Sequence, residues 1–257
     1  MKTIRSSYLI ILLTALTVIV VGCSSTKLDT PLTEGEQLNA LYDKAMLLVK
    51  DKDFVDAAIL FEDIERQYPY SKWAGQAQLM GAYCYFKSDF YDESLNSLDR
   101  FISLHPANEK ISYAFYLRAL NHFNQIEDVE KDQSMTEIAL KSFYEVINKF
   151  PESKFAKESK DKIEIINDRL AAKEMEIARY YQYNHQWISA INRYNLLLDE
   201  HKTSIYTAEA LHRLVEIYYT IGLLEEAKKY AATLGYNFPE SKWYERSFEI
   251  INSETNL

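Results

Sequence analysis

A short phrase built around Pro, Ser and Lys recurs along this chain, and it limits the possible folds more than any other feature. It occurs at 68–74, 150–156 and 238–243, and each copy closes a stretch in which apolar residues recur at helical spacing. A repeated helix pair cannot bury its apolar face alone, so several copies must stack. The phrase therefore predicts a curved solenoid with an extended binding surface, which favours a binding scaffold over a catalyst.

Prolines mark the same position in successive repeats, and their spacing gives the repeat length. They are Pro69, Pro106, Pro151 and Pro239, and Lys202 takes the matching place in another copy. In chain order the separations are 37, 45, 51 and 37 residues, and a tetratricopeptide repeat has about 34. Small residues stand where two helices approach, larger ones fill the gap, and the second helix ends at the proline. The pattern predicts about five helix pairs.

The two longer spacings locate departures from simple stacking. We assign the extra residues of repeat three to a surface loop in the polar run 124–133. The second excess is 14 residues, which corresponds to about four helical turns. Nothing from Ser153 to Tyr183 breaks a helix, so we expect one long helix there, which joins the first three repeats to the last two.

Composition supports an all-α fold. The chain has only six glycines and five prolines in 257 residues, and no segment alternates as a half-buried strand would. We therefore predict an all-α tetratricopeptide-repeat solenoid of about five helix pairs with one long connecting helix. Residues 37–152 form N-terminal repeats one to three, and residues 153–257 form the long helix with C-terminal repeats four and five.

The N-terminus has the order of an export signal. Basic residues in the first five positions precede an apolar run over 8–21, which is too short for a confident membrane span. The ending Gly22-Cys23 resembles the bacterial lipobox, in which the cysteine is acylated and becomes the first mature residue. An ordinary signal with an incidental cysteine is the alternative. We predict a lipoprotein signal peptide over 1–22 and a lipid-anchored flexible tether over 23–36.

The predicted location is the outer membrane, to which the protein is anchored with its folded repeats in the periplasm. Ser24 rather than aspartate follows Cys23, which in bacterial lipoproteins usually implies release to the outer membrane. Two or more acyl chains give stable anchoring where one chain is marginal. The other cysteine, Cys84, stands beside aromatic residues in a predicted helix and is interpreted as a free buried thiol.

Charge and motifs argue against several functions. After removal of residues 1–22 the chain has 27 basic and 38 acidic residues, a net charge of −11, which disfavours nucleic acid and anionic lipid as partners. The histidines are scattered, and the sequence has no glycine-rich phosphate loop, Cys-x-x-Cys pair or nucleophile elbow. We predict a non-enzymatic protein without a metal or cofactor, whose partners are proteins.

Tyrosine is abundant, with 20 residues besides 12 phenylalanines. Most of these rings are expected to pack between helices. A surplus is suited to line a concave groove for an extended peptide, with tyrosine hydroxyls satisfying its backbone. The candidate substrate-peptide-binding residues are Tyr68, Tyr70, Tyr113, Tyr116 and Tyr180.

The lipobox, the five repeats and the stretch 168–174 together resemble the BamD (ComL) family, lipoproteins of the outer-membrane β-barrel assembly machinery. The most specific part runs 178–181 and continues with Trp187 and Asn192-Arg193. The resemblance covers nearly the whole chain. It implies binding of the barrel-forming subunit BamA through the C-terminal repeats. It also implies contact of the N-terminal repeats with the C-terminal targeting strand of unfolded outer-membrane proteins.

The resemblance also assigns roles to individual residues. Tyr68 matches the family's aromatic of the N-terminal pocket, and Tyr180 matches a second tyrosine implicated in substrate contact. Arg193 matches an arginine on the BamA side, with Arg169 and Trp187 as supporting partner-binding residues; an exposed helix charge is the alternative for Arg193. Accessory Bam lipoproteins are further candidate partners. The shorter loop in repeat three and the longer tail after Pro239 depart from the family and bear on those contacts.

Two other classes of protein stay open. Another repeat-containing periplasmic lipoprotein adaptor, of the Tol-Pal or pilus-assembly kind, usually has more regular spacing or an N-terminal coiled coil and lacks the long middle helix. A peptidoglycan enzyme built on a helical superhelix needs a further domain that holds a catalytic glutamate. Nothing in the 257 residues supplies such a domain.

Overall fold

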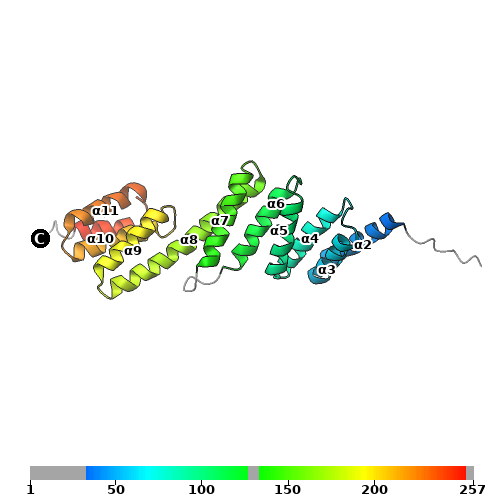
Figure 1. Cartoon of the computed structure of the whole chain (residues 1–257). Helices are drawn as coiled ribbons and strands as arrows, with labels where there is room; N and C mark the ends of the chain where they lie inside the picture. The colour runs from blue at the N-terminus through cyan, green and yellow to red at the C-terminus, as the bar shows by residue number, and fades with distance from the viewer. Residues whose placement is uncertain (1–32, 127–132, 253–257) are drawn as a thin grey trace, which may run out of the picture. The chain divides into compact units, whose positions relative to one another are not determined.

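The computed structural model describes residues 33–126 and 133–252, and within these ranges it contains eleven helices and no strand (Figure 1). The all-α prediction is confirmed. The predicted signal peptide, residues 1–22, and Cys23 lie outside the described residues. The helices are α2 (Glu34–Lys50), α3 (Phe54–Gln67), α4 (Ala74–Lys87), α5 (Tyr91–Leu104), α6 (Ile111–Asn124), α7 (Ser134–Lys149), α8 (Lys154–Tyr183), α9 (Trp187–Glu200), α10 (Thr207–Thr220), α11 (Leu224–Asn237) and α12 (Lys242–Asn252).

The chain divides into one unit that ends at Leu41 and a second that begins at Tyr42. In the described part of the first unit, a capping box starts α2. The Thr33 hydroxyl accepts a hydrogen bond from the Glu36 backbone at 3.4 Å, and the Glu36 carboxylate accepts one from the Thr33 backbone at 2.8 Å. The helix therefore begins inside the range 23–36 that the sequence predicts as a tether.

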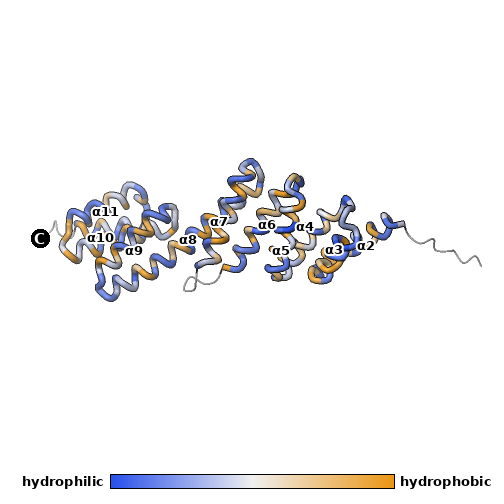
Figure 2. Tube along the Cα trace, in the orientation of Figure 1, coloured by the Kyte–Doolittle hydropathy of each residue, from blue (hydrophilic) through white to orange (hydrophobic). Residues whose placement is uncertain are grey.

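In the second unit, helices that follow one another in the chain pack together from α3 to α12 (Figure 1). The repeats correspond to helix pairs such as α4 with α5, α6 with α7 and α10 with α11. Figure 2 shows apolar and polar residues alternating along these helices, as expected where one face is buried.

The recurring phrase forms one turn that ends the second helix of each repeat. In the first copy, Tyr68 caps α3, and its carbonyl accepts a hydrogen bond from the Ser71 backbone at 3.0 Å. Proline between these residues cannot continue a helix, so the phrase fixes where the next pair starts. The carbonyls that accept the same bond in the other copies belong to His105, Phe150, His201 and Phe238.

A second shared turn joins the two helices within a repeat. It has one residue with positive φ, which is Lys52 at 63°, Asp89 at 61°, His185 at 59° or Gly222 at 80°. The residue after each of these donates a backbone hydrogen bond five positions back, as in a Schellman motif. Of these four residues only Gly222 is a glycine, the residue type that adopts positive φ without steric cost.

Small buried residues allow the paired helices to approach closely, as the pattern predicts. Ala57 and Phe61 of α3 are fully buried, and Ala139 with Phe143 repeats the arrangement in α7. In α5 the small residue is Ser94, whose hydroxyl donates to the Ala82 carbonyl at 2.9 Å. That hydrogen bond satisfies a buried polar group and ties α5 to α4.

The predicted long helix is confirmed as α8, which spans 30 residues. The Ser153 hydroxyl caps it by accepting from the Ala156 backbone at 3.1 Å. Ile163 and Ile166 in its first half belong to a core with α6 and α7, whereas Met175 in its second half belongs to a core with α9 and α10. One helix therefore contributes to two hydrophobic cores.

A final helix, α12, follows the last repeat and was not anticipated from the sequence. It packs on α10 and α11. The approach to α11 requires glycine at position 235, because a Cβ there would lie 2.5 Å from the Tyr244 ring. A hydrogen bond of 2.8 Å between His212 Nδ1 and Ser247 Oγ ties α12 to α10. The helix thus covers one side of the last repeat pair.

Candidate functional site

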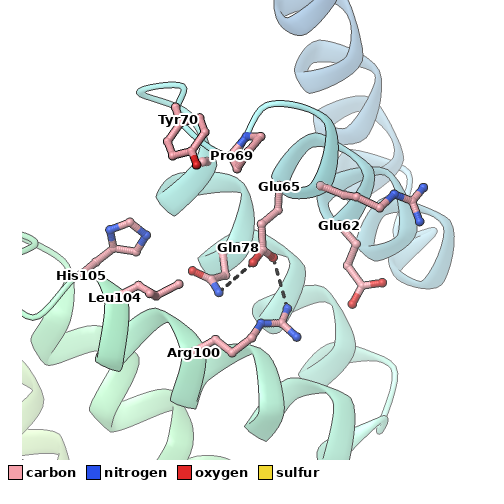
Figure 3. Close-up of a pocket in the computed structure, with 10 residues that line it drawn as sticks. Glu62, Glu65, Pro69, Tyr70, Gln78, Arg100, Leu104 and His105 are labelled. Carbon is pink, nitrogen blue, oxygen red and sulfur yellow. Dashed lines mark hydrogen bonds and ion pairs between the residues drawn. The ribbon is translucent and has the colours of Figure 1, made fainter.

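A hollow of about 640 Å³ lies among α3, α4 and α5, in the first two repeats (Figure 3). We call it the N-terminal groove. Helix α3 contributes Glu62, Glu65 and Arg66, the turn after it contributes Pro69 and Tyr70, α4 contributes Ala74 and Gln78, and the end of α5 contributes Arg100, Leu104 and His105.

An ion pair crosses this groove. Arg100 Nη2 of α5 lies 3.2 Å from Glu65 Oε2 of α3, and Gln78 Nε2 of α4 donates to Glu65 Oε1 at 3.1 Å (Figure 3). The Arg100 side chain is half exposed and uses one nitrogen for this pair. Since a guanidinium carries five N–H donors, Arg100 retains donors for an anionic ligand.

Apolar side chains lie beside the charged groups. Tyr70 is fully exposed and Leu104 is 64% exposed, so both are available to a ligand. His105 lies against Gly75, where an added Cβ would come within 3.2 Å of the imidazole. Glycine at this position therefore lets the histidine ring lie close to α4.

The groove combines cationic donors with exposed apolar surface. Glu62 is held by Tyr85, whose pKa is raised to about 12 by burial and by its hydrogen bond to Glu62. Tyr85 consequently stays a neutral donor at physiological pH. Arg100, with Leu104 one turn further along α5, suits a peptide end that carries both a carboxylate and an apolar side chain. Tyr70 lies at the opposite side of the groove (Figure 3).

The five predicted tyrosines do not gather in this groove. Tyr70 lines it, and Tyr68 caps α3 two residues earlier. Tyr113 and Tyr116 pack their rings 5.4 and 5.2 Å from Phe155, and burial raises the pKa of both. Tyr180 lies far along the chain on α8, 65% exposed, with its ring 5.8 Å from Tyr181.

The three predicted partner-binding residues lie at separate points of the C-terminal half. Arg193 of α9 pairs with Glu174 of α8 at 2.9 Å and keeps 39% of its side chain exposed. Trp187 lines a hollow of about 610 Å³. Arg169 is exposed and lies 6.0 Å from the Phe123 ring. In the described part of the chain, no hydrogen bond, ion pair or ring contact joins any two of the three.

A charged network lies next to Trp187. Arg213 pairs with Glu216 at 2.9 Å, and His212 Nε2 lies 3.2 Å from the same carboxylate. Burial alone would raise the pKa of Glu216, but the hydrogen bonds from His212 and Arg213 outweigh it and lower the pKa to about 2. The network therefore stabilises repeat five while Glu216 is ionised.

Glu216→Gln should reduce the melting temperature near neutral pH, and the difference from wild type should shrink in acid. The folded pKa of Glu216 is about 2, below the roughly 4.3 of an unfolded glutamate. The stabilisation is thus complete above the unfolded value and is lost as pH falls through the folded one. Circular-dichroism melts at several pH values test this, with Glu225→Gln as control, because Glu225 is 88% exposed. A difference independent of pH would contradict it.

Sequence reasoning missed Glu65, Gln78, Arg100, Leu104 and His105 of the N-terminal groove. In the sequence these residues look like ordinary polar residues of a helix or like residues at the end of a helix, so nothing marks them as lining a groove. The available signal was position, because His105 precedes Pro106 as Tyr68 precedes Pro69. Position alone does not distinguish a groove residue from a solvated one.

Among the described helices, none combines the length and apolar content needed to cross a bilayer. Within the same residues, no three histidine, cysteine or acidic side chains converge in a way that could hold a metal ion.

Comparison with known proteins gives a family match. The profile of YfiO, described as an outer membrane lipoprotein, matches residues 34–234. A protein of Caulobacter vibrioides named outer membrane protein assembly factor BamD is 41% identical over 234 residues, covering 91% of this chain and 77% of the relative. A protein of the same name from Rickettsia prowazekii is 42% identical over 235 residues, covering 91% and 93%.

Solved structures that are similar include tetratricopeptide-repeat proteins. One from Thermus thermophilus has a TM-score of 0.36 at 16% identity, covering 83% of this chain and 98% of that one. The repeat domain of P58(IPK) has a TM-score of 0.42 at 13% identity, covering 86% and 56%. At these values the structures carry no argument about function.

Proposed function

Because the chain belongs to the YfiO/BamD family of outer membrane lipoproteins, we propose that it is a non-enzymatic scaffold of the β-barrel assembly machinery. It binds a BamA-like barrel assembly protein and the targeting strands of unfolded outer-membrane proteins. The observation that carries this proposal is the family match over residues 34–234. Relatives at 41% and 42% identity are named assembly factors, which is not an enzyme class.

The N-terminal groove is the proposed site for the targeting strand. Its half-exposed Arg100 offers donors to a terminal carboxylate, and Leu104 on the same helix offers apolar contact to the last side chain. Tyr70, at the opposite side of the groove, offers apolar contact to a side chain earlier in the strand. Tyr68 at the end of α3 and Tyr180 on α8 stay proposed contacts through the family resemblance. Tyr113 and Tyr116 pack against Phe155, so they would affect peptide binding only indirectly, by shaping repeat three.

The C-terminal repeats are the proposed site for the BamA-like subunit. Arg193 is part-exposed and uses one nitrogen in its pair with Glu174, so its guanidinium retains N–H donors for a second carboxylate. Arg169 and Trp187 are proposed as supporting contacts, and accessory Bam lipoproteins as further partners. Anchoring to the outer membrane, with the body in the periplasm, is proposed to occur through acylated Cys23.

Purification of the tagged full chain from detergent-solubilised envelopes tests both parts of the proposal. We expect a BamA-like barrel protein to copurify, and we expect the mature chain to begin at residue 23 with a mass raised by acyl chains. Mass spectrometry reads both results. Recovery of Tol proteins or a pilus secretin instead would favour an adaptor of another envelope system, and an unacylated N-terminus would exclude the lipid anchor.

A further inference from the structure

A second groove occupies the position equivalent to the N-terminal groove, between the last two repeats. This C-terminal groove has a volume of about 570 Å³ and lies among α9, α10 and α11. Nine of its ten lining residues follow a lining residue of the N-terminal groove by 133 positions. The lining includes Asn195, Leu198, Lys202, Leu211, Thr233 and Asn237.

The equivalent positions between repeats two and three are filled by side chains. Phe115 and Phe150 occupy two of them, with ring centroids 5.3 Å apart. Lys149 occupies a third, where it lies 4.5 Å from the Phe115 ring and pairs with Glu145 at 2.8 Å. The open grooves between repeats one and two and between repeats four and five therefore reflect the residues placed there and are not imposed by the repeat fold.

The two grooves differ in the residues at two equivalent positions. Leu198 and Thr233 stand where the N-terminal groove has Glu65 and Arg100, so the ion pair that crosses one groove has no counterpart in the other. At these two positions a ligand of the C-terminal groove meets an aliphatic side chain and a hydroxyl instead of charges.

The remaining charges of the C-terminal groove cancel. Asp199 and Lys202 are exposed and of opposite sign. Leu211 is buried, and with Leu198 it provides an apolar lining. The N-terminal groove also has two acidic and two basic lining residues, so the two grooves do not differ in net charge. They differ because the C-terminal groove has no arginine at the position of Arg100, and therefore no guanidinium to pair with a carboxylate.

Two asparagine side chains in this groove have unused hydrogen-bonding capacity. The Tyr230 hydroxyl donates to Asn195 Oδ1 at 3.0 Å, which fixes the amide and leaves its Nδ2 as a donor. Asn237 Nδ2 donates to the Thr233 carbonyl at 3.1 Å, which leaves Oδ1 as an acceptor. One donor and one acceptor match the C=O and N–H of a peptide backbone.

We propose that the C-terminal groove is a second peptide site, which takes an extended, uncharged segment from within a polypeptide. Its backbone pairs with Asn195 and Asn237, and its apolar side chains lie on Leu198 and Leu211. The site is selective against a terminal carboxylate, the feature that the N-terminal groove is built to accept. It goes beyond the proposed function, which places the targeting strand in the N-terminal groove.

Photocrosslinking to the full chain in detergent tests this. The probe is an uncharged peptide of about ten residues, the length of a barrel strand, in which leucine and tyrosine alternate with serine and threonine. It is capped at both ends and has benzoylphenylalanine at its centre. We expect mass spectrometry to find label in α9–α11. Asn195→Leu should reduce that label by at least about fivefold, the equivalent of one lost hydrogen bond. Asn192→Leu, at an exposed residue of the same helix outside the groove, should not.

Thr233→Arg supplies a second variant that does not depend on the asparagines. It places in the C-terminal groove the cation that Arg100 gives the N-terminal one. A second peptide, of the same sequence but with a free C-terminal carboxylate, should therefore label Thr233→Arg better than the capped peptide does. Equal labelling by the two peptides in wild type, or unchanged labelling in Asn195→Leu with an unchanged melt, would overturn the proposal. The same experiment shows whether the peptide with a free carboxylate labels the N-terminal groove. Absence of that label would count against the proposed function and not against the second peptide site.

Discussion

Arg100→Glu should weaken binding of a peptide that ends in phenylalanine with a free carboxylate by at least about twentyfold. The substitution removes the cation proposed to meet the carboxylate, and it places a third acidic side chain beside Glu62 and Glu65 in the N-terminal groove. Repulsion then replaces attraction at the same point. Titration of the full chain in detergent with the peptide measures the change.

Two further variants isolate the cause of that loss. Lys87→Glu makes the same change in net charge at an exposed residue outside the groove, so it should bind as wild type does. Glu65→Gln frees Arg100 from its ion pair, so it should bind the peptide as tightly or more tightly. Wild-type affinity in Arg100→Glu would move the targeting-strand site out of this groove.

The repeat architecture was predictable because its determinants are local. The long helix α8 follows from the absence of any helix breaker over 153–183, and the ends of the second helices follow from proline at a fixed position. A buried alanine near a large buried residue recurs because the two helices of each pair approach closely and the large side chain fills the space between them. Such features need no knowledge of distant contacts.

The groove was not predictable, because its residues meet only after the repeats stack. Glu65 and Arg100 are 35 positions apart and lie on the polar faces of different helices, where each looks like a solvated charge. Tyr116 looked like a groove residue, yet Phe155 from the next repeat covers it. The stacking geometry decides which face of a helix is covered by the following repeat. The spacing of apolar residues in the sequence does not reveal that geometry.

Helix α12 shows the same limit at the chain's end. Its docking depends on Gly235, and on a hydrogen bond between His212 and Ser247, which are 35 residues apart. None of these three residues carries a signal in the repeat pattern, because α12 stands outside the five helix pairs that define that pattern. A terminal element is thus harder to anticipate than an internal one.

Arg193→Ala should weaken binding of the BamA-like subunit by at least about tenfold, the equivalent of roughly 1.4 kcal/mol. Losing one partner of a desolvated arginine–carboxylate pair at an interface costs on the order of 2 to 5 kcal/mol, so the expected loss is a lower bound. Alanine is preferable to glutamate here, because a glutamate would face Glu174 inside the chain and would disturb the fold.

Glu174→Ala is the matched control, because both variants remove the same intramolecular pair of 2.9 Å. Both variants should lower the melting temperature by the same amount. If Arg193 contacts the partner directly, Arg193→Ala should weaken partner binding strongly, whereas Glu174→Ala should weaken it only slightly, because Glu174 only positions Arg193. Surface-immobilised partner domains titrated with each variant separate these outcomes. Equal binding by the two variants would show that Arg193 serves only to join α9 to α8, and the contact with the partner would then have to lie elsewhere on the C-terminal repeats.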